Sequence, residues 1–282
     1  MDTITTLLPP ALRRHITNLE TAEELRLRAG RRLGIVRGGT ETLSGFIVTA
    51  EIIAAVMEAA TQGSMHTALE SVRGGYITVP GGHRLGLGGT AVMQHGEVKA
   101  LRDISSINIR VARDRRGVAA PLMSRLRRPD ASAYNTLILS PPGLGKTTLL
   151  RDIIRELSDG GLRVSVADER GEIAASYRGA PQLDVGTRSD VLEGCPKAVA
   201  AMLMLRAHSP QVLAVDEITA PEDVEAIRAA SYCGVSLLAT AHGAAMDDLW
   251  RRGAYRGAPE LFERVVTIKM VGGKRTYGVD AL

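Results

Sequence analysis

The segment SPPGLGKTT at 140–148 constrains the fold of this chain more than any other feature. It follows a short apolar run, TLILS at 136–140, that predicts a buried strand. It precedes KTTLLRDIIRELSDG at 146–160, whose apolar spacing predicts a helix. A glycine-rich turn between a strand and a helix holds phosphate groups, because loop amides and the helix N-terminus both face the anion. The sequence therefore predicts an α/β domain built around a phosphate-binding loop.

The residues of this turn match the phosphate-loop pattern G-x-x-x-x-G-K-S/T at all but one position. Gly145, Lys146 and Thr147 match its last three positions, and Ser140 replaces the first glycine. Lys146 is expected to reach the β- and γ-phosphates of ATP, and the Thr147 hydroxyl to bind Mg²⁺. The predicted nucleotide-binding residues are Pro142, Gly143, Leu144, Gly145, Lys146, Thr147 and Thr148.

The chain beyond residue 134 alternates predicted strands and helices. Further apolar strands are expected at 163–168, 211–217 and 235–242, with helices at 196–208 and 222–234. Strands without polar alternation, separated by helices, are typical of a parallel sheet covered on both faces. A hairpin is predicted at the end of the chain, turning at Gly272 and Gly273.

The first part of the chain has a different pattern of residues, without the regular alternation of strands and helices. Glycine pairs separate short strand-like pieces, and TAEIIAAVMEAAT predicts one helix capped by Thr49. We therefore expect a small α+β domain over 1–115, a connector rich in Arg, Ala and Pro over 116–134, and the phosphate-loop domain over 135–282.

Composition excludes several classes of protein. No apolar run reaches the roughly 18 residues that a membrane-spanning helix needs, and two cysteines make neither a disulfide framework nor a metal-binding spacing. The start of the chain lacks the order of a secretory signal, so a cytosolic protein is expected. Aromatic residues make up only 3% and the net charge is +4, which argues against a dedicated nucleic-acid surface.

Acidic residues are predicted at the carboxyl edge of the sheet, where ligands of open α/β sheets bind. Asp216 and Glu217 follow the run VLAV, so Asp216 is expected to assist in holding Mg²⁺ and Glu217 to activate the attacking water. Glu169, in VADERGEIAA after the preceding strand, is a rival candidate for the base. His242 ends the strand LLATAH and is expected to contact the γ-phosphate or the water.

Segments throughout the chain resemble the stage III sporulation protein AA family. They include ISSINIRVAR, SPPGLGKTTLLRD, VADERGEIA, LDVGTRSDVLEGCPK, SPQVLAVDEI and ATAHG, with EELRLRAGRRL and GGYITVPGGHRLGLGGTAV nearer the start. Members of this family tend to read S-P-P at the start of the phosphate loop, so Ser140 fits the resemblance.

That family is similar to the ATPases of type II and type IV secretion. The resemblance implies a RecA-like P-loop ATPase domain with a smaller N-terminal α+β domain, using ATP and Mg²⁺. It further implies a homo-oligomeric ring, usually hexameric, in the cytoplasm of the mother cell and peripheral to the membrane. Membrane channel proteins of the sporulation apparatus would be its partners, and no specific nucleic acid is expected.

The resemblance also bears on individual residues. Secretion ATPases carry an acidic box and a histidine box where VADERGEIA and ATAHG stand, which adds weight to Glu169 and His242. The pair Asp216–Glu217 is complete here, which favours Glu217 as the base but leaves Glu169 in play. Arg110 and Arg113 lie about where the small domain of such ATPases lends arginines to a neighbouring subunit.

Two other functions are open to the sequence alone, whereas a small-molecule kinase is disfavoured because no lid-like, Arg-rich insertion is evident. RecA-like cores also drive nucleic-acid-dependent ATPases, although the scarce aromatic residues argue against stacking on bases. A nucleotide-bound scaffold that hydrolyses slowly is the other alternative, against which stand the intact Lys146, Thr147, Asp216 and Glu217.

Overall fold

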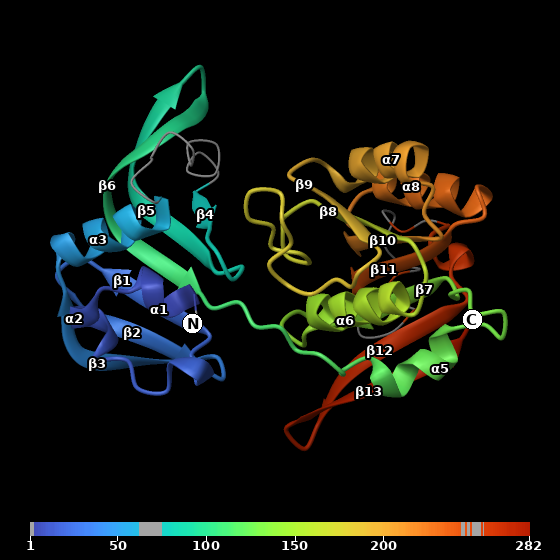
Figure 1. Ribbon diagram of the computed structural model, residues 1–282, viewed down its shortest axis with the longest axis horizontal. Helices are drawn as coiled ribbons and strands as arrows, with labels where there is room; N and C mark the ends of the chain where they lie inside the picture. The colour runs from blue at the N-terminus through green and yellow to red at the C-terminus, as the bar shows by residue number, and fades with distance from the viewer. Residues whose placement is uncertain (1–2, 62–74, 244–245, 247–248, 250–254, 256) are drawn as a thin grey trace. The chain divides into compact units, whose positions relative to one another are not determined.

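The computed structural model describes residues 3–61, 75–243, 246, 249, 255 and 257–282 (Figure 1). The chain forms two compact units, each with its own sheet. The first unit comprises Met1–Arg113 and the later segment Ala175–Gln182, and the second comprises Asp114–Ala174 and Leu183–Leu282. The predicted division at 115 and 134 stays a prediction. Among the described residues, no helix is long and apolar enough to cross a membrane.

The first unit is built on an antiparallel six-stranded sheet. Its strand order is β3 (Thr40–Val48), β2 (Arg31–Arg37), β1 (Glu24–Arg28), β6 (Glu97–Arg110), β5 (Arg84–Gln94) and β4 (Tyr76–Thr78). The helices in its described residues are α1 (Thr3–Leu7), α2 (Pro10–Arg13) and α3 (Ala50–Thr61). The predicted helix is confirmed as α3, and the Thr49 hydroxyl accepts a hydrogen bond from the backbone amide of Ile52 at 3.4 Å.

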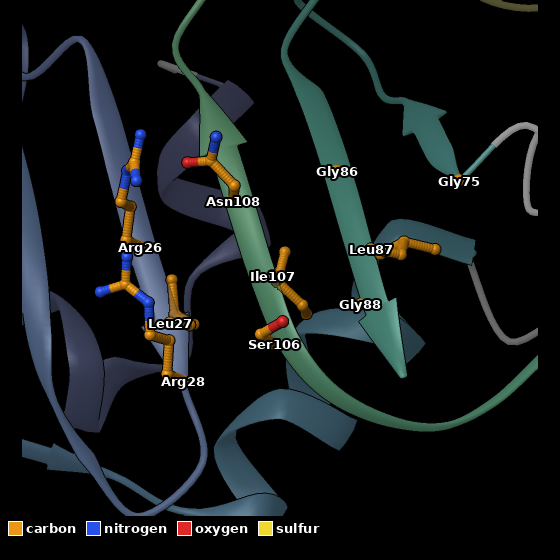
Figure 2. Close-up of a pocket in the computed structure, with 10 residues that line it drawn as sticks. All are labelled: Arg26, Leu27, Arg28, Gly75, Gly86, Leu87, Gly88, Ser106, Ile107 and Asn108. Carbon is orange, nitrogen blue, oxygen red and sulfur yellow. The ribbon is translucent and has the colours of Figure 1, made fainter. Parts of the chain in front are cut away.

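Alternation along the strands of this unit separates an apolar face from a polar one. Leu25 and Leu27 of β1 lie in a core with residues of α3, whereas Arg26 and Arg28 lie on the opposite face. The polar face carries a hollow of about 270 Å³, whose floor includes glycines of β5 and which Asn108 of β6 also lines (Figure 2). Arg26 and Arg28 each pair with a glutamate at 2.9 Å, so both guanidinium charges on this face are balanced locally.

The second unit is built on a seven-stranded, mostly parallel sheet. Its strand order is β13 (Lys274–Ala281), β12 (Arg264–Val271), β7 (Thr136–Ser140), β11 (Ser236–His242), β10 (Val212–Glu217), β8 (Val164–Asp168) and β9 (Ser189–Glu193). Among the strands that the structure describes in this sheet, β13 alone runs antiparallel to its neighbour. Where the structure describes this unit, its α-helices are α5 (Met123–Leu126), α6 (Lys146–Asp159), α7 (Lys197–His208) and α8 (Pro221–Tyr232). This confirms the predicted alternation and the C-terminal hairpin.

Helices cover both faces of this sheet, which explains why its central strands are apolar throughout. Every residue of β7 is buried, with Ile138 in the core beside α6 and Leu137 and Leu139 in the core beside α8. The edge strand β9, in contrast, was not predicted, because its sequence SDVLE is short and half-exposed and carries no strong strand signal.

The turn before β9 supplies a test of this packing. Gly186 has φ +84°, and a Cβ there would lie 2.6 Å from Ser158 Cβ and 2.9 Å from the Arg155 carbonyl oxygen. Gly161 has φ +106° with nothing within 4 Å, so it is a matched control. We expect Gly161→Ala to lower the free energy of unfolding by about 1 kcal/mol through backbone strain alone, and Gly186→Ala to lower it by about 3 kcal/mol. Urea denaturation measures both, and equal losses would show that β9 does not pack as described.

Candidate functional site

The parallel strands bring the predicted site residues to one edge of the second unit's sheet. His242, the last residue of β11, is in register with Ser140 at the end of β7. Glu217, the last residue of β10, is in register with Thr240 of β11. Because the three strands end together, the phosphate loop, Glu217 and His242 converge, as the sequence predicted.

The phosphate loop itself has the backbone that its glycines permit. Gly143 and Gly145 have φ of +79° and +93°, and α6 begins at the next residue, Lys146. Both positions are strained for any residue with a Cβ, which accounts for glycine there. Ser140 is the last residue of β7, within the extended strand, and needs no such freedom. The departure from the phosphate-loop pattern therefore costs the loop nothing.

A chain of polar contacts links three of the predicted catalytic residues. Lys146 Nζ lies 2.5 Å from His242 Nδ1, and His242 Nε2 lies 2.9 Å from Glu217 Oε2. An ammonium group can only donate, so Nδ1 must accept and the ring proton lies on Nε2, which donates to the Glu217 carboxylate. His242 thus joins the lysine of the phosphate loop to the carboxylate of β10 (strand positions in Figure 1).

Burial changes the proton affinity of the charged groups beside this chain. Lys146 is only 8% exposed, and this desolvation lowers its pKa, while Glu217 and Asp216 act in the opposite direction. Asp216 is equally buried, and desolvation together with the nearby carboxylates of Asp168 and Glu172 raises its pKa to about 6. The site therefore holds more negative charge than its surroundings neutralise, an arrangement that favours a bound cation.

The residues fit a magnesium ion that keeps part of its water shell. Thr147 lies in the first turn of α6 and Asp216 at the end of β10, so a hydroxyl and a carboxylate oxygen are available. Mg²⁺ takes such oxygen ligands, completed by water and phosphate oxygens. Within the part of the chain that the structure describes, no group of three or more His, Cys, Asp or Glu side chains could hold a metal ion alone.

Asp168, at the end of β8, has a structural part in the acidic segment. It is fully buried, and its carboxylate accepts hydrogen bonds from the backbone amides of Glu172, Ile173 and Ala174 at 2.9–3.0 Å. These bonds favour the charged form, but burial outweighs them and raises its pKa. Asp168 thus shapes the loop that follows β8.

Glu169 lies in a separate network around a buried lysine. Its Oε2 is 2.7 Å from Lys197 Nζ, and the lysine lowers the pKa of Glu169. The same ammonium group lies 3.5 Å from Asp223 Oδ2 and 3.3 Å from Thr219 Oγ1. The structure therefore groups Glu217 with Lys146 and His242, and places Glu169 with Lys197. Sequence reasoning missed Lys197, because it begins a largely apolar helix, α7, in which nothing marks the lysine as a partner of Glu169.

The two arginines predicted to act on a neighbouring subunit differ in their surroundings. Arg110, the last residue of β6, is 62% exposed and has Glu24 at 3.7 Å. Arg113 donates a hydrogen bond to the Ala22 carbonyl oxygen, which ties it to the backbone of its own unit. Arg110 is thus the more available of the pair.

A further arginine, also missed by sequence reasoning, lies at the phosphate loop. A Cβ placed on Gly145 would be 3.5 Å from both Cζ and Nη1 of Arg275. Arg275 belongs to β13, more than a hundred residues beyond the loop, and only the turn-like run GGKR marked its position in the sequence.

Asp216 is expected to destabilise the fold in the absence of a cation. Its folded pKa of about 6 exceeds the unfolded value of 3.8, so its contribution to stability falls as the pH rises from 4 to 6. Asp216→Asn should therefore raise the free energy of unfolding at pH 8, by on the order of 2 kcal/mol, and change it little at pH 4.

Urea denaturation in EDTA measures this effect. The exposed Glu225→Gln is the control and should change stability by less than about 0.5 kcal/mol at either pH. A loss of stability in Asp216→Asn at pH 8 would contradict the account of the buried carboxylates.

Solved structures share the fold of this chain. The pilus retraction motor PilT with bound ADP aligns with a TM-score of 0.60 at 16% identity, over 94% of this chain and 80% of that one. The ATPase DotB of Yersinia pseudotuberculosis aligns with a TM-score of 0.58 at 17% identity, over 92% of this chain and 74% of that one. The predicted RecA-like P-loop fold is confirmed.

Comparison of sequences identifies the family. The stage III sporulation protein AA of Bacillus subtilis (strain 168) is 38% identical over 288 residues, which span 98% of this chain and 93% of that protein. The family described as Sporulation stage III, protein AA, matches residues 2–278. The chain therefore belongs to the stage III sporulation protein AA family.

Proposed function

We propose that this protein is a Mg²⁺-dependent ATPase. The observation that carries the proposal is the contact chain from Lys146 through His242 to Glu217 beside a phosphate loop. A phosphoryl-transfer site needs a cationic group for the phosphates and a carboxylate for the attacking water. Lys146 and Glu217 supply these two groups at one edge of the sheet. The ADP bound to the similarly folded PilT supports nucleotide binding at such a site.

Each group of the site has a part in this reaction. Backbone amides of Gly143–Gly145 and the N-terminus of α6 would surround the phosphates, and the Lys146 ammonium group would donate its hydrogen bonds to the β- and γ-phosphate oxygens instead of to His242. Thr147 and Asp216 would hold Mg²⁺, which neutralises charge that develops on the phosphates. Burial and neighbouring carboxylates raise the pKa of Asp216, and a bound cation would balance the negative charge that they disfavour.

Glu217 is the base in this proposal. It lies on the strand next to β11 and is aimed by His242, whose Nε2 donates to it. Glu169 is committed to Lys197, and a carboxylate whose pKa is lowered by an ion pair is a weaker base. His242 retains its bond to Glu217 when Lys146 turns to the phosphates, so it couples phosphate binding to the position of the carboxylate.

The family membership supports a biological setting for this activity, which is part of the proposal. The ATPase would form a homo-oligomeric ring and act on the mother-cell side of the membrane. Membrane channel proteins of the sporulation apparatus would be its partners. Exposed Arg110 would complete the site of the adjacent protomer, because an arginine supplied in trans stabilises charge in the transition state.

Steady-state ATP hydrolysis tests the chemistry. We expect Lys146→Ala to abolish nucleotide binding and turnover, and Glu217→Gln to keep binding while kcat falls by 10²–10⁴-fold, the usual loss for a general base. Glu169→Gln is the matched control, since it makes the same change on the adjacent strand end. It should retain most of kcat.

The outcome distinguishes the alternatives. If Glu169→Gln abolishes turnover and Glu217→Gln does not, the assignment of the base is wrong. If activity is low and rises only with single-stranded DNA, the nucleic-acid-dependent ATPase takes the place of this proposal. If the wild type binds ATP without turnover at any concentration, it is a nucleotide-bound scaffold.

Mixing of variants tests the trans arginine and the ring together. We expect Arg110→Ala and Lys146→Ala each to be inactive, and an equimolar mixture to recover activity, because some sites then combine an intact phosphate loop with an intact arginine from the neighbour. Light scattering at the same concentrations measures assembly. Ring formation without recovery in the mixture would show that Arg110 does not act in trans.

A further inference from the structure

The C-terminal hairpin extends to the level of the phosphate loop. Strand β12 runs parallel to β7, with Thr267 in register with Leu139, and continues to Val271 beyond the end of β7. Arg275, on the returning strand β13, pairs with Met270. The hairpin tip therefore projects past the carboxyl edge of the sheet (Figure 1). This places Arg275 beside the phosphate loop, where its guanidinium group approaches Gly145.

Alternation along β13 directs Arg275 to the side of the sheet that α6 covers. Tyr277 and Val279, two and four residues further, both pack in the core cluster that contains the buried residues of α6. Arg275 shares their face, and its guanidinium group approaches Gly145, where α6 begins. Lys274 lies on the opposite face of the same strand. The approach to Gly145 thus follows from strand register.

The strand order places Arg275 and the catalytic chain on different sides of the loop. From β7, the strands with His242 and Glu217 lie in one direction of the sheet, and β12 and β13 lie in the other. The γ-phosphate must face Glu217, so the rest of the nucleotide extends along the loop away from it. Arg275 therefore lies nearer to the nucleoside end of the phosphate chain.

We propose that Arg275 is a nucleotide-binding residue that contacts the phosphates at the nucleoside end, the α-phosphate above all, of ADP or ATP held by the phosphate loop. This inference rests on the proposed function. A guanidinium group presents a planar fork of donors that matches phosphate oxygens. In the described parts of the chain, no carboxylate lies within ion-pair distance of Arg275, so its donors are not committed to an acid.

The position of Arg275 sets the expected kinetic effect. The α-phosphate is present in ADP and ATP alike and changes little in charge during hydrolysis. An interaction with it binds the ground state and the transition state equally, which alters KM and leaves kcat unchanged. Loss of Lys146 or Glu217, by contrast, acts at the reacting phosphate.

Titration of the full-length protein with a fluorescent N-methylanthraniloyl derivative of ADP, together with ATPase kinetics, tests the proposal. We expect Arg275→Ala to raise the Kd for the ADP probe and the KM for ATP by on the order of 10-fold, with kcat within about 2-fold of wild type. Arg275→Lys should recover part of the affinity. Lys274→Ala removes the same charge from the opposite face of β13 and should bind as wild type does.

Other results overturn the inference. An unchanged or lower Kd in Arg275→Ala, with the same melting temperature as wild type, shows that the arginine does not hold the nucleotide. A fall in kcat without a change in Kd places it at the γ-phosphate instead. If wild type and Lys146→Ala both fail to bind the probe, the proposed function fails as well, whereas binding by wild type alone with no effect at Arg275 overturns only this inference.

Discussion

The ammonium group of Lys146 is buried at the beginning of α6, and the arrangement of the second unit depends on how this charge is accommodated. A buried cation is stable only where acceptors and carboxylates surround it. Here the acceptor is His242 at the end of β11, and the carboxylates are Asp216 and Glu217 at the end of the neighbouring strand β10. Those strands can deliver them only if they are parallel, adjacent and of matched length. The parallel strand order of the sheet therefore supplies the acceptor and the carboxylates that the buried Lys146 ammonium group needs.

Much of this arrangement could be predicted from the sequence, because the signals were local. The run TLILS and the helix after it bracket the phosphate loop, and parallel strands place Glu217 and His242 beside it without further information. The contacts between these groups were beyond prediction, since they depend on register. The pairing of Glu169 with Lys197 could not be predicted either, because the lysine begins a helix 28 residues later and nothing in its own segment marks it.

Arg275 shows the limit of such reasoning most clearly. Its strand was predicted as part of a hairpin, yet which element the hairpin would join could not be read from its residues. Only the pairing of β12 with β7 brings it to Gly145. The edge strand β9 was missed for a related reason: its pairing with β8, rather than its composition, makes it a strand.

The segment Ala175–Gln182 belongs to the first unit although the residues on both sides of it belong to the second. It leaves the second unit directly after the loop that Asp168 anchors, joins the first unit, where Gln182 accepts a hydrogen bond from the amide of Gly81 at 2.9 Å, and returns. The backbone therefore connects the two units at three places rather than one. Neither unit therefore corresponds to one continuous segment of the sequence. The segment Ala175–Gln182 therefore joins the first unit covalently to the loop that follows β8 and carries Glu169.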